Sequence, residues 1–163
     1  MKTLLLLRHA KSSWKDSDID DHERPLNKRG KKDAPRMGQL LKEENLLPDL
    51  ILSSSAKRCR KTAEHVIAAS GYRGETRFCG EIYEAHASAL VDFLAKIGEA
   101  KRVLFIGHNP GMEELLESLI GIYTPLSTAA LAQVELDIDS WAGICKEPKA
   151  RLAKIWQPGE LED

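Results

Sequence analysis

The stretch Thr3-Leu-Leu-Leu-Leu-Arg8-His9 opens the chain with a short apolar run that ends in an arginine and a histidine. Residues 103–106 form a second apolar run, and a glycine and His108 follow it. Runs of this length without polar interruption predict parallel strands that are buried on both faces of a sheet. Ligands of open α/β sheets bind at the carboxyl ends of such strands. We therefore expect Arg8, His9 and His108 to share one pocket.

The side chains at these two strand ends suit a tetrahedral anion. A guanidinium group offers planar, forked donors to phosphate oxygens and does not lose its charge. The segment after His108 is Asn109-Pro110-Gly111, which predicts the start of a helix whose unpaired N–H groups would favour an anion. The plainer interpretation of this segment is a turn in which Asn109 caps the helix. Phosphoryl chemistry is the first functional hypothesis.

Strands and helices alternate along the remainder of the chain. Apolar residues recur at helical spacing in four segments, which are residues 27–44, 56–69, 86–97 and 110–121. Four further segments have the composition of strands, and these are residues 49–53, 76–79, 130–136 and 151–156. The last two alternate between apolar and polar residues, which allows them to run antiparallel. This order predicts a three-layer α/β/α sandwich with a mostly parallel central sheet, in a single domain over residues 1–163.

Four basic residues follow the strand that is predicted at residues 49–53. They are Lys57, Arg58, Arg60 and Lys61, and they fall in the first turns of the next predicted helix. Positive charge at that end of a helix is unfavourable against the helix dipole, so the cluster indicates that an anion binds nearby. At least two of the four are expected to form an ordinary solvated face. Arg58, close to the start of the helix, is best placed to reach the pocket.

Composition narrows the class of protein. The net charge of −1 gives no support to binding of nucleic acid or of anionic membrane surfaces, which normally goes with a basic excess. The three cysteines, Cys59, Cys79 and Cys145, lie far apart and lack both zinc-site spacing and the density of a disulfide scaffold. Arg8 cuts the first apolar run short, and no run approaches the roughly 20 apolar residues of a membrane span. We expect a cytoplasmic protein with free thiols.

Three motifs, in this order, resemble those of the histidine phosphatase superfamily. The family's Arg-His-Gly signature corresponds to Arg8-His9-Ala10, its Ser-Ser-Pro-x-x-Arg-x-x-x-Thr-Ala element to residues 54–63, and its later strand-end histidine to His108. Segments 8–12 (Arg-His-Ala-Lys-Ser), 24–30 (Arg-Pro-Leu-x-x-x-Gly) and 107–111 are in addition similar to the SixA-type phosphohistidine phosphatases. The resemblance covers residues 3–121 and implies the histidine phosphatase (phosphoglycerate mutase-like) fold.

The resemblance also implies roles for individual residues. His9 would be the nucleophile that accepts the phosphoryl group. Arg8 and Arg58 would hold its oxygens, and His108 would stabilise the transferred charge. The surrounding cations favour a neutral imidazole at His9, which keeps its lone pair available for attack. Because fixed positive side chains supply the field that a metal supplies elsewhere, no metal or cofactor is expected.

The identity of the substrate depends on further residues. Ser12 and Asn109, in two of the motifs, are expected to contact it. Many members of the family place a glutamate after a central strand as general acid; Glu81 is the nearest counterpart and Glu84 the next, and an exposed acidic loop explains both equally well. An alkoxide leaving group needs such an acid, which contributes about 10²–10⁴-fold in rate. The imidazole of a phosphohistidine leaves readily once it is protonated, so a site without an assured acid favours P–N cleavage.

The favoured interpretation is a phosphatase that removes phosphate from phosphohistidine on a protein, through a phosphohistidine intermediate on the enzyme. The first alternative is a phosphomonoesterase or mutase of the same superfamily that acts on a small phosphorylated metabolite. The second alternative is an adaptor that binds phosphate without turnover. A pure binder has no need of a nucleophile, which argues against the adaptor.

Overall fold

One sheet forms the centre of the structure, a computed structural model that describes residues 1–161. Its strands, within these residues, are β1 (Lys2–Arg8), β2 (Leu50–Ser54), β3 (Glu75–Cys79), β4 (Arg102–Gly107), β5 (Leu131–Leu136) and β6 (Ala150–Trp156). They lie in the order β3-β2-β4-β1-β5-β6. The first four strands of the chain are parallel, whereas β5 is antiparallel to β1 and β6 to β5. The predicted α/β class with a mostly parallel sheet is therefore confirmed.

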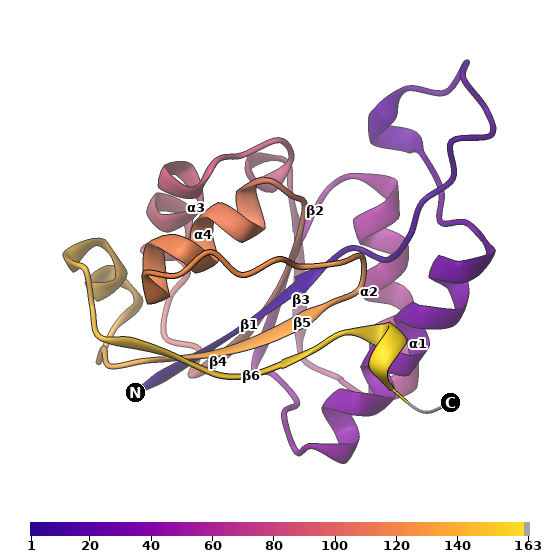
Figure 1. Cartoon of the computed structure of the whole chain (residues 1–163). Coiled ribbons are helices and arrows are strands. Elements are labelled where there is room, and N and C mark those ends of the chain that lie inside the picture. Colours follow the sequence, from indigo (N-terminus) through magenta and orange to yellow (C-terminus); the bar gives the residue numbers. More distant parts are fainter. Residues whose placement is uncertain (162–163) are drawn as a thin grey trace.

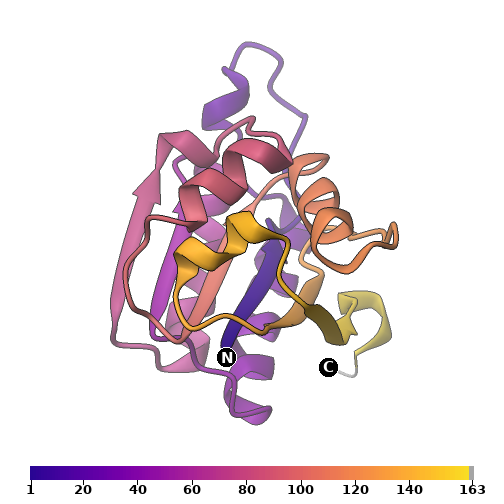
Figure 2. The ribbon, with the colours of Figure 1, turned by 90° about the vertical axis from the view of Figure 1, so that its left-hand side faces the viewer.

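Helices cover both faces of this sheet (Figure 1). On one face, α1 (Lys28–Glu43) packs against α2 (Lys57–Ser70). The other face carries α3 (Ala87–Leu94), α4 (Gly111–Ile120) and the 3₁₀ helix η3 (Trp141–Lys146), which are seen from outside in Figure 2. Shorter 3₁₀ turns are η1 (Asp21–Glu23), η2 (Gly80–Ile82) and η4 (Pro158–Glu160). None of the helices between residues 1 and 161 has the length and apolar character needed to cross a bilayer.

The leucine run of β1 is buried from both sides of the sheet. Leu4 and Leu6 belong to the apolar core that includes α3 and α4 residues, and Leu5 and Leu7 to the core that includes α1 and α2 residues. All four are completely buried. Each buried leucine stabilises the fold by about 1.5–3 kcal/mol relative to an exposed one, so the run fixes the register of β1. That register pairs the last residue of β1 with the last residue of β4, which brings the segments after the two strands together.

Three of the four predicted helices lie within one residue of their predicted bounds, and α3 is the exception. α3 stops at Leu94, three residues before the predicted end, and the chain then turns through Gly98 with a φ of 104°, which favours glycine. α4 begins at Gly111, and Asn109 does not cap it. Asn109 Nδ2 instead donates to the Leu126 carbonyl at 2.9 Å. The interpretation of Asn109 as the helix cap is therefore wrong, because its amide is used to fix the loop that precedes β5.

α1 continues without a break through Pro35, although Gly30 and Pro35 predict a weak first half. Asn27 caps the helix, since Asn27 Oδ1 accepts the Gly30 N–H at 2.9 Å. Gly30 also permits a close approach of two segments: a Cβ at this position would lie 2.1 Å from the Lys11 carbonyl oxygen. The start of α1 is thereby packed directly against the segment that follows His9.

Candidate active site

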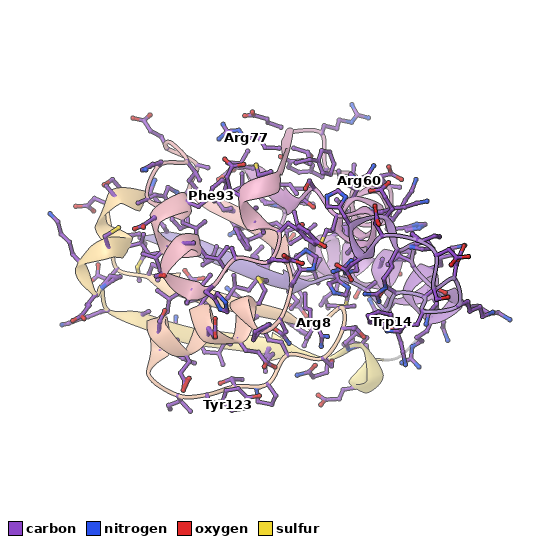
Figure 3. The ribbon with its side chains drawn as sticks, turned by 90° about the horizontal axis from the view of Figure 1, so that it is seen from above. Arg8, Trp14, Arg60, Arg77, Phe93 and Tyr123 are labelled. Carbon is purple, nitrogen blue, oxygen red and sulfur yellow. The ribbon has the colours of Figure 1, made fainter. Side chains whose placement is uncertain are left out.

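A cavity of about 380 Å³ opens at the carboxyl ends of β1 and β4. We call it the strand-end pocket, and its lining residues are Arg8, His9, Lys11, Ser12, Trp14, Arg24, Arg58, His108, Asn109 and Thr128. Figure 3, which views the molecule from above with side chains, labels two of these residues, Arg8 and Trp14. The structure thus brings together Arg8, His9, Arg58 and His108 from β1, α2 and the end of β4, and it places Ser12 and Asn109 in the same walls.

His9 presents one defined ring nitrogen to this pocket. Its Nδ1 lies 2.7 Å from the Ala10 carbonyl oxygen, and because a carbonyl can only accept, Nδ1 carries the hydrogen and donates it. The lone pair of the neutral ring is therefore on Nε2. Burial, together with the positive charges of Arg58 and Arg8, lowers the pKa of His9 to about 4, against the opposing effect of the Ala10 hydrogen bond. The ring is consequently neutral at physiological pH.

Two side chains lie close to one ring nitrogen of His108, Nε2. His108 Nε2 lies 2.8 Å from Ser54 Oγ and 3.4 Å from Cys59 Sγ. The Ala56 N–H donates to Ser54 Oγ at 3.2 Å, and the Ser54 hydroxyl can in turn donate to the imidazole. Burial raises the pKa of Cys59 to about 12, so its thiol also keeps its hydrogen. When the Ser54 hydroxyl donates, Nε2 of His108 accepts and the hydrogen of the neutral ring is on Nδ1.

Nδ1 of His108 is buried and has no hydrogen-bond partner among residues 1–161. The two histidine rings lie close together, with 5.2 Å between the ring centroids of His9 and His108. Burial, together with the neighbouring His9 and Arg58, lowers the pKa of His108 to about 3. The pocket thus places two neutral imidazole rings close together, and the second of them, His108, has an unpaired buried nitrogen.

Arg8 and Arg58 supply fixed positive charge. Arg8 Nη1 donates to the Leu126 carbonyl at 3.0 Å, while its buried Nε has no partner within the described chain. Arg58 is 7% exposed, and it donates from Nη1 to the Asp21 carbonyl at 2.8 Å and from Nη2 to Asp21 Oδ2 at 3.1 Å. Both guanidinium groups are oriented before any anion arrives, which is the arrangement that stabilises developing phosphoryl charge most effectively.

Asp21 and Arg24 belong to the same network, and the sequence analysis assigned them no role. Arg24 Nη1 donates to Asp21 Oδ1 at 2.9 Å, Arg24 Nε donates to the Ser13 carbonyl at 3.2 Å, and Arg24 Nη2 donates to the Ser12 hydroxyl. The Tyr83 hydroxyl donates to Asp21 Oδ2 at 2.6 Å. Burial opposes ionisation of Asp21, but Tyr83, Arg24 and Arg58 together hold its pKa well below the usual range. Arg24 could have been found from the sequence, because it belongs to the Arg-Pro-Leu motif of residues 24–30. Asp21 could not, because nothing in the sequence distinguishes it from the neighbouring acids.

Glu81 lies outside the strand-end pocket. It lines a separate groove beside α3 with residues such as Cys79 and Phe93, so the structure does not support it as the general acid. Glu84 lines a neighbouring cavity of about 330 Å³ that also contacts Arg58 and His108. The two glutamates line different cavities because Glu81 lies within η2, on the side of α3, whereas Glu84 lies two residues beyond the end of η2.

The remaining basic residues of α2 form the expected solvated face. Arg60 pairs with Glu23 at 3.3 Å and Lys61 with Glu64 at 3.0 Å, and their side chains are 38% and 43% exposed. Of this basic cluster, Arg58 is the residue that lines the strand-end pocket. No group of three or more histidine, cysteine, aspartate or glutamate side chains within residues 1–161 is arranged to hold a metal ion.

Comparisons with known proteins agree with this arrangement. The sequence matches the histidine phosphatase superfamily (branch 1) over residues 4–87. An uncharacterised chloroplastic protein of Arabidopsis thaliana is 35% identical over 150 residues, which is 86% of this chain and 69% of that protein. A candidate phosphohistidine phosphatase SixA of Agrobacterium tumefaciens has a similar structure, with a TM-score of 0.84 and 30% identity over 96% of this chain and 98% of that one.

A second functional class is also among the relatives. A 2,3-bisphosphoglycerate-dependent phosphoglycerate mutase of Bifidobacterium longum is 38% identical over 72 residues, which is 41% of this chain and 28% of the mutase. The superfamily match, the six-stranded sheet and the solved SixA relative all lead to one assignment. This chain belongs to the histidine phosphatase superfamily.

Proposed function

We propose that this chain is a metal-independent phosphatase that takes a phosphoryl group onto Nε2 of His9 and then hydrolyses it, with phosphohistidine on a protein as its favoured substrate. One observation carries the proposal: the 2.7 Å hydrogen bond from His9 Nδ1 to the Ala10 carbonyl leaves Nε2 as the free lone pair in a pocket that Arg8 and Arg58 make positive. A neutral, oriented imidazole among fixed cations is suited to attack phosphorus.

In the first step, the lone pair of Nε2 forms a bond to phosphorus while the bond from phosphorus to the leaving nitrogen breaks. His9 keeps its Nδ1 hydrogen, so the phosphorylated ring becomes positive, and the Ala10 carbonyl stabilises that charge. Arg8, Arg58 and the unpaired Nδ1–H of His108 donate to the phosphoryl oxygens. In the second step, water attacks phosphorus, the electron pair of the P–N bond returns to Nε2, and inorganic phosphate leaves.

The acids near the pocket favour P–N over P–O cleavage. Asp21 is ionised and engaged by two arginines and Tyr83, which makes it unsuitable as a proton donor. A phosphohistidine that is protonated on its other ring nitrogen departs as neutral imidazole, so the protein does not need to supply an acid. An alcohol leaving group would have to take up a proton.

A small-molecule phosphomonoesterase or mutase is the second candidate, and the position of Glu84 favours it. Glu84 lines a cavity that shares Arg58 and His108 with the strand-end pocket, so it is the acidic side chain to test as a proton donor to a leaving alcohol. The two candidates predict opposite effects of Glu84→Gln. The substitution would leave phosphohistidine hydrolysis unchanged under the first proposal, and it would abolish most phosphomonoester hydrolysis under the second.

The test combines trapping and substrate comparison. Wild-type protein treated with a labelled phosphodonor is expected to acquire acid-labile, base-stable label, and His9→Ala is expected to acquire none. His65→Ala, a histidine substitution outside the strand-end pocket, provides the matched control. Turnover of a phosphohistidine peptide is then compared with turnover of sugar phosphates and phosphoglycerate. Label that persists in His9→Ala would refute the assignment of His9 as the nucleophile. Faster turnover of the metabolites than of the peptide would support the second candidate. Binding of phosphate without turnover of any substrate would support a non-catalytic adaptor.

A further inference from the structure

Trp14 is an unusual residue in the wall of the strand-end pocket. It lies in the loop between β1 and η1, and it is 76% exposed. Single exposed apolar residues are common on protein surfaces, so exposure alone carries no functional meaning. Trp14, however, combines its exposure with a place in the lining of the cavity that His9 and Arg8 also line. A substrate whose phosphorus faces His9 would have its leaving group near this indole.

One face of the Trp14 ring is already covered by a fixed cation. The guanidinium carbon of Arg24 lies 3.2 Å from the centroid of the indole. Arg24 is 7% exposed, and its donors are engaged by Ser12, Ser13 and Asp21. Because this guanidinium cannot move freely, it holds the indole in place by cation–π contact and leaves the opposite ring face uncovered by it.

The backbone around Trp14 is tied down as well. The Ser13 N–H donates to the Pro25 carbonyl at 2.8 Å, and the Lys15 N–H donates to Ser13 Oγ at 3.2 Å. Ser12 and Leu26 form a β-bridge immediately before this point. The loop therefore presents the indole at the pocket without requiring a ligand to order it, which reduces the entropy lost when a substrate binds.

We propose that Trp14 is a specificity-determining residue that stacks its free face on the leaving ring of the substrate. The inference rests on the proposed phosphatase function and adds a substrate class: phosphoryl groups carried by a flat ring, such as the imidazole of phosphohistidine. Aromatic rings stack favourably on an indole in offset or edge-to-face geometry. A phosphorylated sugar or glycerate offers no ring of this kind. Trp14 thus selects substrates by the shape of the leaving group, after the arginines have bound the phosphate.

The test compares two substrates that share a P–N bond. Phosphohistidine peptide carries the ring, whereas phosphoramidate has only an amino group on phosphorus. In Trp14→Ala, the ratio of kcat/KM for the peptide to that for phosphoramidate is expected to fall about tenfold, mainly through KM, whereas Trp14→Phe keeps most of it. Phe78→Ala, which removes an exposed aromatic ring on β3, is the matched control and leaves the ratio unchanged. An unchanged ratio in Trp14→Ala would overturn the inference.

Binding of an inert ligand provides an independent readout. A peptide with a phosphorylated triazole in place of phosphohistidine is expected to change tryptophan fluorescence in the wild type, since the other two tryptophans, Trp141 and Trp156, are buried. The change is absent in Trp14→Phe, and a change that persists there contradicts the stacking. Wild-type protein that hydrolyses phosphoramidate and phosphomonoesters but not phosphohistidine would refute the proposed substrate itself. Failure of the ratio test alone refutes only the role of Trp14.

Discussion

Arg58 directs two N–H groups at a single residue, Asp21: Nη1 donates to its carbonyl oxygen at 2.8 Å and Nη2 to its carboxylate at 3.1 Å. The carboxylate also accepts from Arg24 at 2.9 Å. Asp21 therefore orients two arginines of the strand-end pocket, and its negative charge opposes the positive potential that attracts phosphate. Orientation and charge have opposite consequences for anion binding, and substitutions can separate them.

Substitution of Asp21 by asparagine removes the charge and retains the shape. Asp21→Asn is expected to bind inorganic phosphate more tightly, because a negative charge next to Arg58 has been removed. The inhibition constant for inorganic phosphate should therefore fall about fivefold. The kcat is expected to fall, since Arg58 loses its charged partner and is held less firmly. Asp20→Asn makes the same charge change one residue away. If it alters phosphate inhibition equally, the effect is one of net charge and the contact with Arg58 is not its cause.

Stability should depend on pH through the two pocket histidines. Their pKa values in the folded protein are about 4 for His9 and about 3 for His108, below the ordinary value near 6.5. The unfolded chain therefore binds more protons between these values, and stability that is fully present above pH ~6.5 is lost as the pH falls toward the folded pKa values. At pH 5 the loss from His9 is roughly 2 kcal/mol, at about 1.4 kcal/mol per pH unit.

Urea unfolding at a series of pH values from 7 to 4.5 measures this loss. His9→Asn removes one of the two groups, so the decline of unfolding free energy with falling pH is expected to be shallower than in the wild type. A decline of equal slope in both proteins would mean that His9 titrates normally in the folded state. It would also remove the physical reason for a neutral nucleophile in the proposed mechanism.

Ser54 is expected to act as a positioning residue through His108. Ser54→Ala removes the hydroxyl that donates to His108 Nε2 at 2.8 Å, so the ring hydrogen is no longer confined to Nδ1. We expect kcat to fall about tenfold or more with little change in KM, because the lost donor acts most strongly on the transition state. Ser53→Ala is the matched control: this serine is equally buried and donates only to the Ser54 carbonyl. Equal loss of kcat in the two variants would contradict the positioning role.

The sequence was sufficient for the sheet and for part of the pocket. The unbroken apolar runs of β1 and β4 can only be buried in the middle of a sheet, and a strand end determines where Arg8, His9 and His108 lie. The link between Asp21 and Arg58 could not be predicted, because it spans 37 residues and depends on how an irregular loop folds back over α2. Several acids of that loop look equivalent in the sequence, and only η1 selects Asp21 among them.

Glu81 is the converse case, a residue that the sequence suggested for the pocket and that the structure places outside it. The sequence places it after a strand, where the family carries its general acid, but the distance along the chain does not specify which way the side chain points. The turn of η2 sends Glu81 to the groove beside α3. Regular elements thus follow from periodicity, whereas the positions of side chains on short turns depend on tertiary contacts that no local pattern encodes.

Gly30 provides the most direct test of how α1 supports the site. A Cβ at Gly30 would lie 2.1 Å from the Lys11 carbonyl oxygen, and neither backbone can yield without moving the segment two residues after His9. Gly30→Ala is expected to destabilise the protein by about 1–3 kcal/mol through overpacking and to reduce kcat/KM even in the folded fraction. Gly38→Ala is the matched control in the same helix, because its Cβ would meet the Val66 carbonyl of α2 at 2.6 Å, and neither Gly38 nor Val66 lines the strand-end pocket. Unfolding free energy and activity of both variants separate the two effects: both should lose stability, but only Gly30→Ala should lose activity at a temperature where the protein is fully folded. Full activity in folded Gly30→Ala would show that the pocket tolerates a shift of the segment after β1.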